Sequence, residues 1–132
     1  GEIDDVWIHN KTKKLIIADY KATSKKTEVN LDADWQIAYK RQMEFYQWLM
    51  RSNGFEVEDE GWFVYCNGKV FDNHFNGQLS FDIKMIPHQG DDAWIEPTLD
   101  NIKTCLDSEI TPPSNANCKY CKYIDNINLV SK

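Results

Sequence analysis

Two carboxylates and a lysine near the start of the chain have the residue types and the spacing of a metal-dependent hydrolytic site. Asp4 and Asp19 can hold Mg²⁺ or Mn²⁺, because these ions take hard oxygen ligands from one or two carboxylates together with water and substrate phosphate. Lys21 comes two residues after Asp19, so on a strand both side chains point to the same face. Its ammonium can orient water or counter the charge of a phosphate. The three residues therefore predict phosphodiester hydrolysis, in which a cation neutralises developing charge and activates water.

Two predicted strands must bring these side chains together. Residues 3–8 and 14–20 read as strands joined by a polar turn at 9–13, which predicts a hairpin carrying one carboxylate on each strand. Residues 15–18 are apolar on both faces, as is typical of a strand buried within a sheet. The polar residues at 19–21 should therefore emerge where that strand leaves the core.

A helix is predicted to follow, beginning at Asp32 or Asp34, either of which can cap it, and ending near Ser52. Gln42 interrupts its otherwise apolar face, so the amide must find a partner, and Tyr46 lies one turn onward. The remaining members of this face include Trp35, Ala38, Tyr39, Phe45 and Leu49.

The rest of the chain completes an α/β pattern. Residues 61–66 and 79–86 read as two further strands, and 94–108 has helical spacing with Pro97 in the first turn. An irregular tail is expected after the prolines at 112–113. With 132 residues, 42% of them hydrophobic and 27% charged, the chain is expected to form a single domain over 1–132.

Three motifs in register resemble a known family. Residues 1–4 (GEID) and 17–21 (IADYK) resemble the G-x-I-D and D-x-K motifs of RecB-like nucleases in the PD-(D/E)XK superfamily, and residues 42–46 (QMEFY) resemble their Q-x-x-x-Y motif. The resemblance implies a restriction-endonuclease-like α/β fold, with a mixed central sheet flanked by helices. It also implies that the chain cleaves DNA.

The resemblance further implies roles for the site residues. Asp4 and Asp19 would bind Mg²⁺ or Mn²⁺ with help from the backbone carbonyl of Tyr20, and Lys21 would position or activate the nucleophilic water. Such an enzyme is expected to be an exonuclease of recombination, repair or phage replication, acting on single- or double-stranded DNA, with a helicase or recombination protein as a possible partner.

Gln42 and Tyr46 would then support the site or the DNA, which places them in the predicted catalytic set. The alternative is structural: a glutamine satisfied by nearby backbone and a tyrosine packed in the core. Both alternatives remain open from the sequence.

A second function class competes with the nuclease. The formal charge of −6 argues against a basic coat for nucleic acid, and relatives carry an upstream helix with a further ligand, whereas this chain begins at Gly1. A longer protein, truncated here at the N-terminus, is therefore expected. The alternative function is a noncatalytic nucleic-acid-binding or assembly module that retains the fold.

The cysteines and the hydropathy indicate the compartment. No apolar run reaches the ~18 residues of a membrane helix and no secretory signal is visible, so a cytoplasmic location without membrane association is expected. Cys118 and Cys121 have the spacing that can hold zinc or part of an iron–sulfur cluster, but reduced thiols are the favoured interpretation. Cys66 and Cys105 are expected to pack in the core.

The histidines and tryptophans give weaker signals. His9, His74 and His88 fall in predicted turns or loops and are assigned to no metal. Four tryptophans could stack on unpaired bases, although core packing is the commoner role of each: Trp35, Trp48, Trp62 and Trp94.

Overall fold

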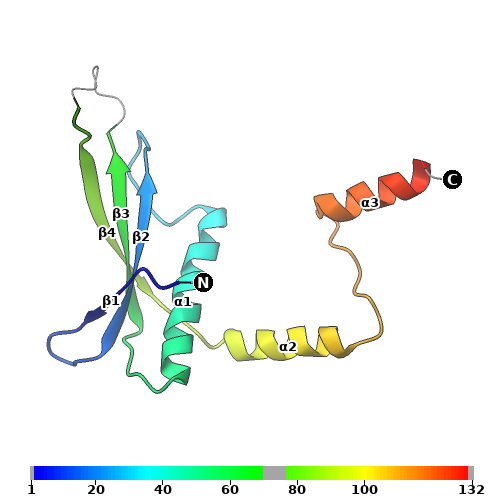
Figure 1. Cartoon of the computed structure of the whole chain (residues 1–132), viewed down its shortest axis with the longest axis horizontal. Coiled ribbons are helices and arrows are strands. Elements are labelled where there is room, and N and C mark those ends of the chain that lie inside the picture. The colour runs from blue at the N-terminus through cyan, green and yellow to red at the C-terminus, as the bar shows by residue number, and fades with distance from the viewer. Residues whose placement is uncertain (1, 70–76, 131–132) are drawn as a thin grey trace. The chain divides into compact units, whose positions relative to one another are not determined.

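A computed structural model describes residues 2–69 and 77–130 of the chain. The chain divides into two compact units, residues 1–95 and 96–132. The first unit holds one four-stranded sheet in the order β1-β2-β3-β4 (Figure 1). Its strands are β1 Asp5–Ile8, β2 Leu15–Thr23, β3 Glu60–Gly68 and β4 Phe81–Gln89.

The sheet is mixed, as predicted. Strands β1 and β2 form the expected antiparallel hairpin, β2 and β3 are parallel, and β3 and β4 are antiparallel. Parallel neighbours need a crossover, and here it contains helix α1 (Ile37–Ser52). The α/β fold class is therefore confirmed.

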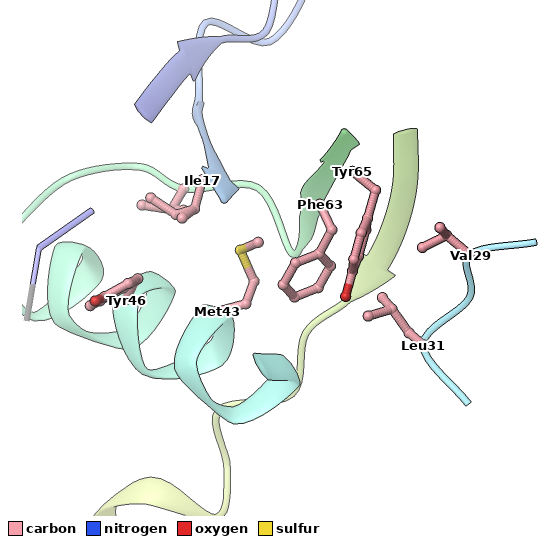
Figure 2. Packing of buried hydrophobic residues seen from close by; sticks show 8 residues of the cluster. Ile17, Val29, Leu31, Met43, Tyr46, Phe63 and Tyr65 are labelled. Atoms are coloured by element: carbon pink, nitrogen blue, oxygen red, sulfur yellow. The ribbon is translucent and has the colours of Figure 1, made fainter. Parts of the chain in front are cut away.

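The core lies between α1 and one face of the sheet. Figure 2 shows Met43 reaching from α1 toward Ile17 of β2 and Phe63 of β3, and each of these side chains is at most 1% exposed. A methyl group at Gly61 would lie 2.5 Å from the Met43 sulphur, so glycine is what lets the helix approach the sheet here. The cluster is completed by Val29, Leu31, Tyr46, Val57 and Tyr65.

The helix begins later than its pattern predicted. Residues Asp34–Gln36 form a 3₁₀ turn whose preceding residue, Ala33, is extended, and no side chain caps it. Asp32 and Asp34 are therefore not the caps of α1. The reason is Gln36, which is fully buried and whose side-chain oxygen accepts from the Ala33 N–H at 2.9 Å.

The second unit corrects the prediction of an irregular tail. It contains two helices, α2 (Ile95–Asp107) and α3 (Lys119–Val130), and only Ile95 of α2 belongs to the first unit. Tyr120, Tyr123, Ile124 and Ile127 have the three- and four-residue spacing of a helical face, which is the local pattern that predicts α3 despite the two preceding prolines. None of the described helices is long and apolar enough to span a membrane.

Candidate active site

The centre of the site is a carboxylate buried on the α1 face of the sheet. Ile17, Asp19 and Lys21 alternate along β2, so the core residue Ile17 sets the face on which the other two lie. Asp19 is only 3% exposed, whereas the Lys21 side chain is 17% exposed. Along this face of β2, the side chains therefore pass from the buried Asp19 to the more exposed Lys21.

Asp19 is incompletely compensated. Its buried Oδ2 atom is paired with the Lys21 ammonium and has no other polar partner among the described residues. Burial raises the pKa of the Asp19 carboxyl above its usual range, the Lys21 ammonium opposes that rise, and the negative charge of Asp4 adds to it. A cation beside Oδ2 would supply the missing interaction.

Asp4 lies next to this position. Its Oδ2 accepts a hydrogen bond from the backbone N–H of Tyr20 at 2.8 Å. Strand β1 begins at Asp5, which pairs with Ala18, so continuing the register by one residue sets Asp4 beside Asp19. The prediction that Asp4 belongs to the strand is wrong, because its carboxylate takes the N–H that a backbone carbonyl would otherwise accept.

Gln42 and Tyr46 form a chain of hydrogen bonds toward the same segment. Gln42 Nε2 donates to the Tyr46 hydroxyl at 3.1 Å, and that hydroxyl donates to the backbone carbonyl of Glu2 at 2.8 Å. Glu2 lies two residues before Asp4, so α1 is tied to the segment that carries this carboxylate. The sequence left open whether Gln42 finds backbone or site partners, and it finds Tyr46.

Lys21 has a second contact that limits its movement. Its ammonium lies 4.5 Å from the centre of the Tyr39 ring, over the ring face, in the first turn of α1. Lys21 is therefore held between the Asp19 carboxylate and an aromatic ring. The sequence placed Tyr39 on the predicted helix, where it also fits the family pattern, but did not indicate this contact with Lys21.

The oxygen donors present fit a hard divalent cation. Asp4 and Asp19 supply two carboxylates at the β1–β2 corner, and Tyr20, which lies between Asp19 and Lys21 in the chain, has a backbone carbonyl as a further oxygen donor. Among residues 2–69 and 77–130, no group of three His, Cys, Asp or Glu side chains could hold a metal ion. The arrangement thus suits an ion such as Mg²⁺, which keeps several waters, better than one requiring a full protein cage.

Two predictions about histidines and cysteines need correction. His88 is not in a loop: it lies on β4 with a side chain 15% exposed, and its Nε2 atom is 2.8 Å from Glu44 Oε1. The β4 register, which the sequence pattern did not give, brings it to α1. Cys105 is exposed on α2 and does not pack in the core, and Cys66 is half-buried. His74 lies outside the described residues.

The C-x₂-C pair lies in the second unit, at the start of α3. Cys118 and Cys121 are free, half-buried thiols, and the Cys121 N–H donates to Cys118 Sγ at 3.4 Å. Nothing in the described chain adds a third ligand to them.

The family comparison agrees with the geometry. The model of the PD-(D/E)XK nuclease superfamily matches residues 1–125. The chain belongs to the PD-(D/E)XK nuclease superfamily. That match spans the β1–β2 corner, α1 and both units of this superfamily member. Neither the curated proteins nor the solved structures give a significant match to the chain.

Proposed function

We propose that this superfamily member is a Mg²⁺- or Mn²⁺-dependent DNA exonuclease of the RecB-like type. The observation that carries the proposal is the buried Asp19 oxygen, whose sole polar partner among the described residues is the Lys21 ammonium and which lies beside a second carboxylate, Asp4. A protein keeps an incompletely compensated buried carboxylate at a cost in stability, and functional sites are where that cost is commonly found.

Each residue of the corner has a role in this proposal. Asp4 and Asp19 hold the cation, with the Tyr20 carbonyl as a further oxygen ligand. When bound, the cation neutralises charge on the phosphate and lowers the pKa of water. Lys21, fixed by Asp19 and Tyr39, orients the attacking water or neutralises charge on the scissile phosphate.

Gln42 and Tyr46 act as positioning residues. Through the Glu2 carbonyl they fix the segment that ends in Asp4, and so they keep its carboxylate beside Asp19. The proposal therefore gives this motif a site-building role, in which neither side chain needs to touch DNA.

Cleavage of end-labelled DNA tests the proposal. The full chain is incubated with linear single-stranded, linear double-stranded and covalently closed circular DNA, with Mg²⁺ or Mn²⁺ and with EDTA. We expect metal-dependent loss of at least one linear substrate and survival of the circle, because an exonuclease needs an end. Lys21→Ala is expected to slow cleavage by about 10²–10⁴-fold.

A matched lysine variant makes the test specific. Lys103→Ala removes an exposed lysine of α2, 76% exposed and paired only with Asp107 among its described contacts, and should cleave at the wild-type rate. Thermal unfolding of both variants checks that they fold. Equal background cleavage by wild type and Lys21→Ala contradicts the nuclease, and cutting of the circle contradicts the exonuclease.

The noncatalytic module remains the competing function, since no third side-chain metal ligand is present in the described chain. Salt-sensitive DNA binding without cleavage under every metal condition favours it. The proposal also includes a cytoplasmic location, supported by the four free cysteines, one nuclease domain over 1–132, and action with a helicase or recombination protein in recombination, repair or phage replication.

A further inference from the structure

Trp35 is an exposed aromatic side chain beside the proposed active site. It lies in the 3₁₀ turn before α1 and is 57% exposed, although its sequence pattern favoured core packing. Other exposed aromatic rings occur on this chain, so exposure alone indicates no ligand, and the contacts of Trp35 carry the argument.

The backbone under Trp35 is fixed by its neighbour. Gln36 is fully buried, and its Nε2 donates to the Asn30 carbonyl at 2.7 Å and lies 3.4 Å from the Tyr65 hydroxyl. Tyr65 is the β3 residue paired with Lys21. The turn is thus anchored to the sheet at the level of the site while Trp35 points outward.

Two successive ring contacts link Trp35 to the proposed active site. The Trp35 and Tyr39 rings meet edge to face with centres 5.4 Å apart, and the Lys21 ammonium lies 4.5 Å from the centre of the Tyr39 ring. A nucleotide whose phosphate reaches Lys21 therefore has Trp35 within reach of a neighbouring base.

A lysine completes the surface. The Lys25 ammonium lies 5.5 Å from the centre of the Trp35 ring. The Lys25 backbone is clamped by Asn67 at the end of β3: the Lys25 N–H donates to Asn67 Oδ1 at 2.8 Å, and Asn67 Nδ2 donates to the Lys25 carbonyl at 3.0 Å. These bonds fix the backbone that carries the Lys25 side chain, and in the position over the ring its charge can pair with a backbone phosphate.

From this juxtaposition we infer that Trp35, with Lys25, is a stacking platform for an unpaired base next to the scissile phosphate, so that the site takes single-stranded DNA. The inference rests on the proposed function and deepens it. Stacking requires a free base face, and a duplex covers the faces of its bases. An indole with a flanking cation is the combination that binds single strands without reading sequence.

Binding to two oligonucleotides tests the platform. Anisotropy in EDTA measures the affinity of a fluorescent thymidine oligonucleotide and of an abasic one of equal length, which has the same phosphates but no bases. We expect Trp35→Ala to weaken binding of the thymidine oligonucleotide about tenfold and that of the abasic one less than twofold. Trp35→Phe, which keeps an aromatic face, should recover most of the affinity.

Phe55→Ala is the matched control, because Phe55 is 51% exposed in the loop after α1 and should leave both affinities unchanged. Equal weakening of both oligonucleotides by Trp35→Ala, no weakening, or no oligonucleotide binding by wild type overturns the inference. Cleavage separates the two proposals. Base-dependent binding through Trp35 without any cleavage overturns the nuclease alone, whereas wild-type cleavage with an unchanged KM in Trp35→Ala overturns the platform alone.

Discussion

Two polar clusters of the first unit, one at the end of α1 and one at the β1–β2 corner, differ in how many partners their charged groups have. At the C-terminal end of α1, Arg51 donates to Asp92 and Asp59 at 2.6 Å each and to the carbonyls of Val57 and Glu58 at 3.3 and 3.2 Å. At the β1–β2 corner, the buried Asp19 Oδ2 has the Lys21 ammonium as its sole polar partner among the described residues.

The neighbours of Arg51 show the same completeness. Gln47 is 1% exposed and donates to the carbonyls of Glu58 and Asp59 at 3.2 and 2.9 Å. Glu44 is placed between His88, 2.8 Å from Oε1, and Trp94, whose indole N–H donates to Oε2 at 2.7 Å. Arg51, Gln47 and Glu44 thus each have two or more protein partners.

The difference distinguishes polar groups that stabilise the fold from polar groups whose missing compensation a ligand could supply. Burying a charge without full compensation is costly, so a satisfied cluster stabilises the native state and an unsatisfied one reduces its stability. By this reasoning the Arg51 cluster should matter for stability and the Asp19 corner for function. If this interpretation is right, substitutions in the Arg51 cluster lower stability, and substitutions at the Asp19 corner affect function instead.

Removing Arg51 should have the largest effect on stability. Arg51→Ala deletes four hydrogen bonds and leaves two carbonyls and Asp92 without this donor, so we expect a loss of about 1–3 kcal/mol in the free energy of unfolding. Urea denaturation measures it. Lys103→Ala, which breaks an exposed i,i+4 pair, is the control and should cost less than about 0.5 kcal/mol. A loss for Arg51→Ala no larger than that of the control would break the comparison.

Neutralising Asp19 should raise the free energy of unfolding, by less than Arg51→Ala lowers it. Without divalent cation at pH 7, Asp19→Asn is expected to stabilise the protein by about 0.5–2 kcal/mol, because it removes a buried charge that its surroundings only partly compensate. A stability loss in the variant at neutral pH would show that Lys21 compensates this carboxylate fully.

The pH dependence sharpens this prediction. Since the pKa of Asp19 is raised in the folded state, its contribution to stability is present below the unfolded pKa and is lost as pH rises through the folded pKa. The advantage of Asp19→Asn should therefore vanish in acid, where the wild-type carboxyl is protonated, and grow toward neutral pH. Paired urea titrations across this range measure the difference.

The sequence predicted the parts of this account that depend on short-range pattern. The apolar run at 15–18 gave the buried strand, and the i,i+4 spacing of Gln42 and Tyr46 brought them into contact. The family motifs indicated Asp4 and Asp19, and these residues also depend on a short-range feature because a single hairpin joins them. The roles of these residues stay predictions.

Other features depend on contacts that local pattern does not encode. The exposure of Trp35 follows from Gln36 binding the Asn30 carbonyl, which replaces a first helical turn by a 3₁₀ turn. The pairing of His88 with Glu44 follows from the register of β4, set across the sheet rather than along the chain. The Arg51 cluster likewise depends on two backbone carbonyls of the loop after α1, and backbone carbonyls carry no sequence signal.

Calorimetric titration of the full chain with Mn²⁺ tests the central claim most directly, with Asp19→Asn and Arg51→Lys as the compared variants. We expect wild type and Arg51→Lys to bind the ion and Asp19→Asn to lose that binding, because the ion's ligands belong to the β1–β2 corner and not to the satisfied cluster. Absence of Mn²⁺ binding by the wild type, or equal binding by all three proteins, would contradict the account.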